Sequence, residues 1–209
     1  MSSVADGCDR MTWQADTLRY YSDHAEEFAA DTQTLEFSAM QSVFLQALPK
    51  HADILDFGCG AGRDTKAFLM AGHRVRAIDG CPELCSIASR FAGIPVSCMT
   101  FDALEDSACY DGIWASASLL HLRLDELISV LKKIRCALRM DGILYTSFKY
   151  GCFEGMRNGR FFIDMTEARL DDVMHQVAGL EIRQHFVTSD MRSGREHEKW
   201  LNLLMRRCG

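Results

Sequence analysis

The run Ile54–Asp64 constrains the fold of this chain more than any other stretch. It reads ILDFGCGAGRD, an apolar segment that ends in the acid Asp56, passes through alternate glycines and opens a helical pattern. A turn from strand to helix gathers backbone N–H groups and the positive helix end around one spot, which suits an anionic or carboxylate-bearing ligand. The glycines Gly58, Gly60 and Gly62 allow a ligand to approach the backbone closely, because they have no Cβ atom.

The spacing of these glycines separates two kinds of nucleotide site. A dinucleotide-binding loop needs the pattern G-x-G-x-x-G. Counted from Gly58 the last position is Arg63, and counted from Gly60 it is Thr65, so glycine completes neither register. The sequence therefore disfavours a nicotinamide or flavin cofactor. An ordinary strand–loop–helix corner is the other interpretation, which the acid, the three glycines and the apolar strand together make the weaker one.

The composition fits one α/β domain. The chain has 209 residues, 48% of them hydrophobic, and a chain of this length buries roughly 70% of its unfolded surface. Its formal net charge of −6 repels phosphate backbones, which argues against nucleic acid as the main partner. No apolar run reaches the roughly 18 residues of a membrane span, and residues 1–15 lack the pattern of a secretion signal. We therefore expect a cytoplasmic protein without a membrane partner.

The nine cysteines predict neither a disulfide framework nor a metal site. An odd number of cysteines in a chain of this length is typical of reduced thiols. Cys81 and Cys85 are four residues apart, but no C-x-x-C pair or histidine cluster completes a set of metal ligands. We therefore expect no bound metal.

Strand and helix patterns alternate along most of the chain, which predicts a parallel sheet with helices on both faces. Strands are expected at residues 53–57, 74–79, 95–100, 111–116 and 143–148, and helices at 61–71, 82–91, 124–138 and 167–178. The end of the chain differs, because Leu180–Val187 and Lys199–Arg206 read as two strands of a hairpin joined by a polar loop.

Two further helical patterns, Thr17–Ala30 and Leu35–Leu48, precede the first strand. We expect them to form a helical cap within residues 1–50, placed on a Rossmann-like core of residues 51–209. Residues 1–209 are thus expected to form a single domain.

Three segments carry a resemblance to a known family. The pattern D-x-G-x-G-x-G at Asp56–Gly62 resembles the first motif of the class I S-adenosylmethionine-dependent methyltransferases. Tyr110–Ser116 is similar to the fourth motif of that family. Leu138–Gly142 resembles its usual L-k-p-G-G turn, although Met140 and Asp141 depart from the pattern.

A narrower resemblance is to the small tellurite-resistance-type (TehB-like) methyltransferases, carried by Ile54–Asp64, Ala115–His121 and Ser147–Gly151. The family resemblance implies a Rossmann-like fold, with a seven-stranded, mostly parallel sheet that finishes in an antiparallel hairpin. It also implies S-adenosyl-L-methionine as the methyl donor and S-adenosyl-L-homocysteine as the product.

The cofactor is expected beyond the carboxyl ends of the strands, where open α/β sheets bind ligands. Asp79 ends the second strand and can accept hydrogen bonds from both ribose hydroxyls, or alternatively cap the helix that begins at Pro82. The resemblance places Asp102 near the adenine amino group and the backbone of Ala103 near the ring, while a plain turn carboxylate is the alternative. The expected cofactor-binding residues are Asp56, Gly58, Cys59, Gly60, Gly62, Asp79, Gly80, Cys81, Asp102, Ala103, Ser116 and Tyr20.

The acceptor is expected between the later strands and the cap. His121 is the candidate catalytic residue, as a base or to orient the acceptor, and a capping or packing histidine is the alternative. Tyr20 or Tyr21 can close over the sulfonium by a cation–π contact, or simply pack in the core. The loops Gly151–Arg160 and Thr188–Glu198 carry arginines that would attract an anionic acceptor, or would be solvated. The expected acceptor-binding residues are Tyr21, Tyr150, Arg157 and Arg192, with Lys149, Arg160 and Arg195 nearby.

These expectations combine into a methyltransferase that acts on a small molecule or a small oxyanion by direct in-line displacement. The partner would be the small acceptor itself, and the protein a monomer or a homodimer. Two alternatives remain open at this point: a tRNA-modifying methyltransferase, and a protein that binds S-adenosylmethionine without catalysis.

Overall fold

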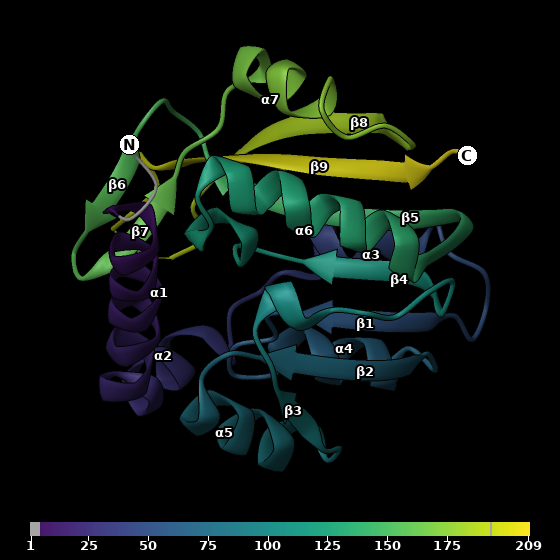
Figure 1. The fold of residues 1–209 in the computed structure, drawn as a ribbon. Coiled ribbons are helices and arrows are strands. Elements are labelled where there is room, and N and C mark those ends of the chain that lie inside the picture. The colour runs from purple at the N-terminus through teal and green to yellow at the C-terminus, as the bar shows by residue number, and fades with distance from the viewer. Residues whose placement is uncertain (1–4, 193) are drawn as a thin grey trace.

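The computed structural model describes residues 5–192 and 194–209, with side chains described from residue 13 onward. Seven strands form one sheet in the order β3-β2-β1-β4-β5-β9-β8 (Figure 1). Strands β3, β2, β1, β4 and β5 are parallel, and β9 is antiparallel to both of its neighbours. The bounds are β1 Asp53–Phe57, β2 Arg74–Asp79, β3 Val96–Cys98, β4 Tyr110–Ala115, β5 Leu138–Lys149, β8 Leu180–Ser189 and β9 Lys199–Arg207. The predicted Rossmann-like methyltransferase fold is therefore confirmed.

The order of the strands fixes where a ligand can bind. From β1 the chain continues outward to β2 and β3, and then returns to the other side of β1 to form β4 and β5. The carboxyl ends of β1 and β4 thus flank a switch point in the strand order. Helices leave these two strands in opposite directions, so the crevice between them stays open to a ligand.

Helices cover both faces of the sheet, as predicted. Helices α3 (Ser38–Leu45) and α4 (Arg63–Met70) lie on one face, while α6 (Leu124–Ala137) and α7 (Glu167–Met174) lie on the other (Figure 1). Helix α5 (Pro82–Ala92) packs beside α4. None of the helices in the described part of the chain is long and apolar enough to cross a membrane.

Aromatic side chains fill the core between α3, α4 and the sheet. Trp114 of β4 stacks on Tyr145 of β5, with ring centroids 3.9 Å apart. Phe44 of α3 and Phe68 of α4 pack on the same indole at 5.1 and 5.3 Å. All four side chains are fully buried, so this cluster contributes apolar burial and joins the two helices to the centre of the sheet.

The helices before β1 differ from the prediction. The expected helix Thr17–Ala30 is two helices, α1 (Ala5–Asp23) and α2 (Ala25–Thr32), which meet at His24. His24 departs from helical geometry at ψ 20°, and both its backbone N–H and its Nδ1 bond the carbonyl oxygen of Tyr20. The helix is interrupted at this residue, where the aromatic spacing alone predicts one continuous helix.

Two strands of the sheet differ in length from their predictions. Strand β3 has only three residues, because a 3₁₀ turn at Phe101–Ala103 follows almost at once. Strand β5 begins at Leu138, five residues earlier than expected. The register between β4 and β5 shifts after Leu138, where Asp141 has a φ of 63°, so the expected turn Leu138–Gly142 is a bulge inside the strand.

A second, two-stranded sheet was not predicted. Strands β6 (Glu154–Arg157) and β7 (Arg160–Ile163) form a hairpin that begins inside the predicted polar loop Gly151–Arg160 and continues three residues beyond it. Its turn is Asn158–Gly159, with φ values of 50° and 77°. Positive φ at both positions is the geometry of the two-residue turn that Asn-Gly favours. This dipeptide is therefore the feature of the sequence that indicates the hairpin.

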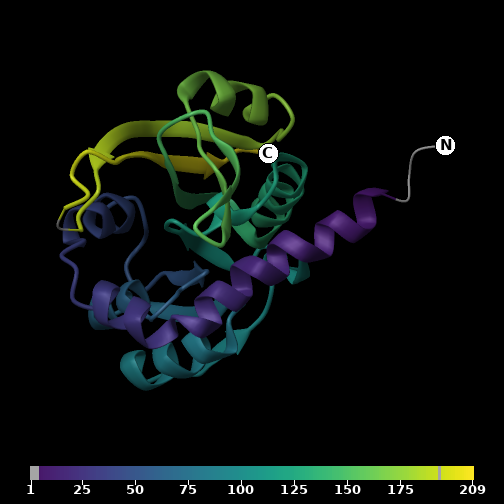
Figure 2. The same ribbon diagram turned by 90° about the vertical axis from the view of Figure 1, so that its left-hand side faces the viewer.

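Helix α1 and the β6–β7 hairpin lie together across the carboxyl ends of the strands (Figure 2). The N–H of Phe161 donates a hydrogen bond to Oγ1 of Thr17 at 3.0 Å, and Trp13 packs on the Phe161 ring at 6.0 Å. These contacts make α1 and the hairpin one roof over the edge of the sheet where a ligand is expected.

The contact between β4 and α3 generates a stability prediction at Gly112. A Cβ added to this residue would lie 2.6 Å from Cζ of Phe44 and 2.9 Å from Cδ1 of Leu48. We expect Gly112→Ala to lower the free energy of unfolding by about 1–3 kcal/mol through overpacking, measured by urea denaturation. Combining it with Phe44→Leu makes room, so the double variant should lose less than the sum of the single losses. Additive losses would show that this contact is not the cause.

Candidate functional site

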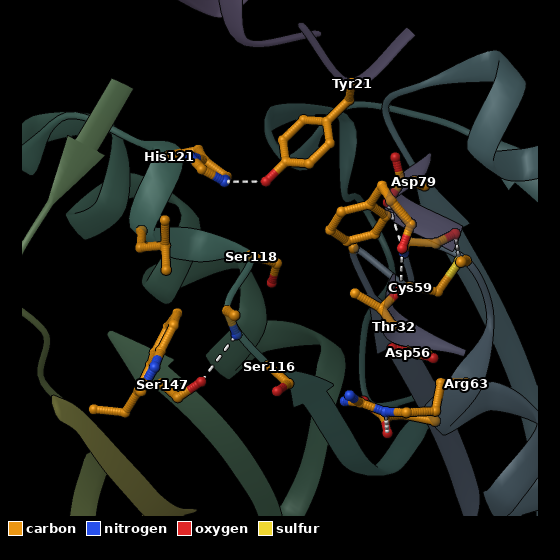
Figure 3. A pocket seen from close by; sticks show the side chains of 18 of the residues that line it. Tyr21, Thr32, Asp56, Cys59, Arg63, Asp79, Ser116, Ser118, His121 and Ser147 are labelled. Carbon is orange, nitrogen blue, oxygen red and sulfur yellow. Dashed lines mark hydrogen bonds and ion pairs between the residues drawn. The ribbon is translucent and has the colours of Figure 1, made fainter. Parts of the chain in front are cut away.

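A cavity of about 610 Å³ lies beneath the roof at the carboxyl ends of the strands, within the size range of small-molecule sites. It is lined by residues from the loop after β1, the ends of β2 and β4, strands β5, β7 and β9, and helices α1 to α3. Figure 3 shows Asp56, Cys59 and Asp79 on one side of this cavity, with Tyr21 and His121 on the other. The cavity therefore joins the two halves of the site that the sequence predicts.

The loop after β1 is fixed to the end of β2 by backbone hydrogen bonds. The N–H groups of Gly58 and Cys59 both donate to the carbonyl oxygen of Ile78, at 3.0 and 2.9 Å. Gly58 has a φ of 87°, and a Cβ there would lie 2.5 Å from Cβ of Ser118. Glycine is required at this position by both conformation and space.

Asp79 connects this loop to the start of α5. One carboxylate oxygen accepts the N–H of Gly60 and the other accepts the N–H of Cys81, each at 2.9 Å. Burial raises the pKa of Asp79, while these backbone hydrogen bonds oppose that shift. The Asp79 side chain lines the cavity, where a ligand can reach it. It also bonds the N–H of Cys81, the residue directly before α5, so it occupies both of the positions that the sequence left open.

Asp56 and Asp64 form a buried acidic pair beneath the loop. The Asp56 carboxylate accepts a hydrogen bond from Thr65, and burial together with the nearby Asp64 raises its pKa to about 8. Asp64 accepts two hydrogen bonds from Arg63 and one from Nε1 of Trp114, each at 2.8 Å. The raised pKa favours the protonated form of Asp56.

The end of β3 contributes a third part of this wall. Phe101 packs on Phe57 with centroids 4.8 Å apart, and its ring edge would lie 3.1 Å from a Cβ at Gly58. Asp102 lines the cavity with an exposed side chain, and its carbonyl oxygen accepts Nζ of Lys133 at 2.6 Å. Ala103 is outside the lining, and its N–H is used in a turn to Thr100.

Serines complete the floor of the cavity between β4 and β5. Ser116 lines the cavity directly after β4. Ala117 has a φ of 51°, and its N–H donates to Oγ of Ser147 at 2.9 Å. Oγ of Ser118 donates to the carbonyl oxygen of Phe57 at 2.8 Å, which ties the segment after β4 to the end of β1.

Tyr21 and His121 are hydrogen-bonded across the cavity (Figure 3). Nδ1 of His121 bonds the carbonyl oxygen of Phe161 at 2.7 Å, and since a carbonyl only accepts, this nitrogen carries the proton. Nε2 therefore accepts the hydroxyl proton of Tyr21, at 2.8 Å. Burial lowers the pKa of His121 to about 4, so the imidazole is neutral at physiological pH.

Basic side chains gather at the end of the cavity formed by β5, β7 and β9. The lining includes Lys149, Arg160, Arg192 and Arg195. Burial is the main cause that lowers the pKa of Lys149 to about 8, and its ammonium is ion-paired with Glu198. Arg192 makes two hydrogen bonds to Asp190, which neutralises much of its charge.

The structure does not bring every predicted residue to the cavity. Tyr20 is outside the lining, where its ring stacks on His24 at 4.3 Å. Tyr150 is exposed and donates to Glu167 at 2.7 Å, while Arg157 is ion-paired with Asp164 at 2.8 Å. These three side chains point elsewhere because neighbouring groups already hold them.

Two predicted residues, Gly62 and Cys81, lie outside the cavity lining and support the residues that form it. Gly62 has a φ of 87°, and a Cβ there would lie 3.1 Å from Ala88 of α5. Cys81 is buried, and only its backbone N–H reaches Asp79. Gly62 permits close packing of two helices, and Cys81 orients a carboxylate that does line the cavity.

Several residues of the lining were not predicted. Gln14, Thr17 and Leu18 of α1 lie on the same helical face as Tyr21. Their spacing of three and four residues indicates this face, but the predicted helix begins only at Thr17. Phe28 of α2 lies against the glycine loop, 3.1 Å from where a Cβ on Gly60 would stand. Further unpredicted lining residues are Phe37, Arg63, Asp64, Phe162, Trp200 and Asn202.

Comparison with known proteins agrees with this arrangement. Residues 54–142 match the family described as a methyltransferase domain. No curated protein matches the chain. Many solved structures share its fold.

Three of these solved structures illustrate the similarity. A 1,6-didemethyltoxoflavin-N1-methyltransferase of Burkholderia thailandensis, with 1,6-didemethyltoxoflavin and S-adenosylhomocysteine bound, has a TM-score of 0.77 at 22% identity and covers 100% of this chain and 93% of its own. A TehB-like S-adenosylmethionine-dependent methyltransferase of Corynebacterium glutamicum has a TM-score of 0.64 at 21% identity, covering 91% and 97%. The N-methyltransferase NodS of Bradyrhizobium japonicum, in complex with S-adenosylhomocysteine, has a TM-score of 0.67 at 15% identity, covering 89% and 97%.

The matched segment contains the glycine loop, Asp79 and the strands that build the cofactor side of the cavity. The whole chain, including the hairpin at its end, has the fold of these enzymes. Residues 54–142 are therefore similar to a methyltransferase domain, and the chain as a whole has the fold of the class I S-adenosylmethionine-dependent methyltransferases.

Proposed function

We propose that this methyltransferase acts on a small-molecule acceptor by direct in-line displacement, without a covalent enzyme intermediate. The observation that supports this proposal is the single cavity that holds both the glycine loop with Asp79 and the pair Tyr21–His121. When bound, S-adenosylmethionine supplies an electrophilic methyl group on a sulfonium. The contribution of the protein is then to align this methyl group with the acceptor and to keep bulk water away.

The residues around the loop fit the donor. Gly58 and Gly60 have positive φ and allow the loop to pack against neighbouring side chains, and Asp79 retains lone pairs beyond its two backbone hydrogen bonds. These lone pairs can accept the ribose hydroxyls. The carboxylate form of Asp79 would also favour the positive charge of the donor.

The other half of the cavity fits a small acceptor. Helix α1 and the β6–β7 hairpin roof it, and the aromatic rings of Tyr21, Phe162 and Trp200 line it. A roofed, partly aromatic cavity of about 610 Å³ suits a small molecule better than a tRNA, which the net charge of −6 also disfavours. The Burkholderia enzyme, which is similar over the whole length of this chain, binds a small heterocyclic molecule, which supports the same class of acceptor here.

Tyr21 and His121 are placed to orient the acceptor. Because the Tyr21 hydroxyl donates to His121, its oxygen can accept hydrogen bonds. Nη1 of Arg160 occupies one lone pair at 3.5 Å, and the other can accept from a donor in the cavity. An acceptor N–H, O–H or S–H that bonds there would direct its own lone pair toward the methyl group. The neutral imidazole keeps this arrangement above a pH of about 5, since its pKa is about 4.

The first test concerns the methyl donor and the acceptor. S-adenosylhomocysteine at 100 times its dissociation constant should raise the free energy of unfolding by about 2.7 kcal/mol, measured by thermal denaturation, whereas NAD should not. Release of S-adenosylhomocysteine should then be detected with one or more compounds from a panel of thiols, selenium and tellurium oxyanions, amines and heterocycles. Release with tRNA alone would favour the nucleic-acid alternative, and binding without release from any compound would favour a non-catalytic protein.

The second test removes the carboxylate beside the glycine loop. Asp79→Ala should weaken the binding of S-adenosylmethionine by about 1–3 kcal/mol, measured by calorimetry, because a hydrogen-bonded charge is lost. Asp53→Ala is the matched control, since Asp53 pairs with Arg74 and Arg139 at the opposite end of β1. If the two variants bind the donor equally well, Asp79 does not hold the ribose.

The third test separates orientation from structure at His121. His121→Ala should lower turnover more than it lowers donor affinity, because the pair with Tyr21 lies on the acceptor side. Equal losses in both quantities would make His121 a structural residue.

The fourth test uses the pH dependence of stability. The folded-state pKa of His121 is about 4, below its ordinary value of 6.5, so neutral His121 stabilises the fold fully above pH 6.5 and this contribution is lost as the pH falls to 4. His121→Gln should therefore lose less stability than the wild type between pH 6.5 and pH 4, measured by urea denaturation at each pH. A wild-type imidazole that titrates near 6.5 by NMR would contradict the burial on which this rests.

A further inference from the structure

We propose that Arg160 binds an anionic oxygen group of the acceptor, a carboxylate or a similar oxyanion, and so selects acidic acceptors over neutral ones. This inference rests on the proposed function and extends it to a class of acceptor. It follows from how the cations of the site are paired, from what surrounds Arg160, and from where Arg160 stands in the cavity.

Most cations around the cavity already have a carboxylate partner. Arg63 pairs with Asp64 at 2.8 Å and Arg192 with Asp190 at 2.5 Å. Lys149 is likewise paired with Glu198. Among the side chains that the structure describes, from residue 13 to 192 and from 194 to 209, none places a carboxylate in an ion pair with Arg160.

Arg160 is instead held between aromatic rings. Its guanidinium carbon lies 4.2 Å from the ring centroid of Tyr20, 5.2 Å from that of Phe162 and 5.6 Å from that of Tyr21. These faces hold a flat cation by electrostatic attraction and leave the side chain half-buried, but they accept few of its hydrogen bonds. Tyr20 thus acts on the site through Arg160, although its own ring is outside the cavity lining.

The hydrogen-bond donors of Arg160 are largely unused. Nε is buried without a partner, and Nη1 reaches only the hydroxyl oxygen of Tyr21, at 3.5 Å. A guanidinium carries five N–H donors in a planar fork whose geometry matches a carboxylate. The buried Nε–H without a partner costs free energy unless an acceptor joins it, and an anion would satisfy it together with the other donors.

The position of Arg160 is fixed by the hairpin. It directly follows the Asn158–Gly159 turn, and a Cβ on Gly159 would lie 3.1 Å from the ring of Tyr20. The next residue, Phe161, is anchored on both sides, by Thr17 of α1 and by His121. The guanidinium is therefore presented beside the Tyr21 hydroxyl, so an anion bound to Arg160 would place the rest of the acceptor next to the pair Tyr21–His121.

Arg195 and Arg157 do not offer the same site. Arg195 lines the cavity mouth, but its side chain is exposed, so water screens its charge. Arg157 belongs to the same hairpin as Arg160, yet it is paired with Asp164 and is outside the cavity lining. The sequence predicts Arg157 as an acceptor-binding residue, and we propose Arg160, three residues later, in its place.

The test compares a carboxylate with its neutral amide. Benzoate and benzamide have nearly the same shape, and their affinities for the protein saturated with S-adenosylhomocysteine can be measured by calorimetry without any turnover. We expect benzoate to bind roughly tenfold or more tightly than benzamide, the ratio that one charge-assisted hydrogen bond gives. Arg160→Gln should bring the two affinities within about twofold of each other, whereas Arg160→Lys, which keeps the charge without the fork, should retain part of the preference.

Arg157→Gln is the matched control, because it removes one positive charge from the same hairpin outside the cavity. It should leave the preference for benzoate unchanged, and the melting temperature of each variant shows whether it is folded. Equal binding of both probes to the wild type, or a preference that survives in Arg160→Gln, would overturn the proposal. If benzoate is preferred through Arg160 but no acceptor is methylated, the anion site stands and the proposed function fails. If an acceptor is methylated but Arg160 does not discriminate between the probes, the proposed function stands and the anion site fails.

Discussion

The site depends on the hydrogen bonds that join the loop after β1 to the end of β2. Two N–H groups of the loop bond the carbonyl oxygen of Ile78, and a third bonds the side chain of Asp79. These bonds cross between neighbouring parallel strands, so the sheet itself sets the shape of the loop. The glycines make this shape accessible, and Ser118 and Phe101 fill the space that a side chain at Gly58 would need. The donor half of the cavity is therefore anchored directly to the centre of the sheet.

The two halves of the cavity differ in charge because different elements build them. The end of β2 supplies the carboxyl group of Asp79, while strand β7 of the hairpin supplies Arg160, which has no carboxylate in an ion pair among the described side chains. A cationic donor and an anionic acceptor would each be attracted to the matching half. The fold thus separates opposite charges along one cavity in a protein whose net charge is −6.

The sequence predicts the donor half of the site better than the acceptor half, for a physical reason. Strand periodicity locates β1 and β2 to the residue, and the carboxyl end of a parallel strand must face the ligand crevice, so Asp79 follows from local patterns. Tyr20 and Tyr21 are neighbours in the chain but lie about 100° apart around a helix, and only the packing of α1 decides which one faces the cavity. Arg157 and Arg160 are likewise separated by a turn of two residues, and their partners come from distant segments. Contacts of that kind are fixed by tertiary structure, which local patterns do not contain.

The alternation of side chains along β7 has a consequence for how such an enzyme can change its acceptor. Arg160 and Phe162 face the cavity, while Phe161 between them packs on Trp13 of α1. Insertion or deletion of one residue in the Asn158–Gly159 turn would exchange these faces, removing the cation and presenting an apolar ring. The hairpin forms its own small sheet, so this exchange would leave the hydrogen bonds of the donor loop intact. Acceptor selectivity could then diverge between related chains through the length of one surface turn, while the use of the same donor is preserved.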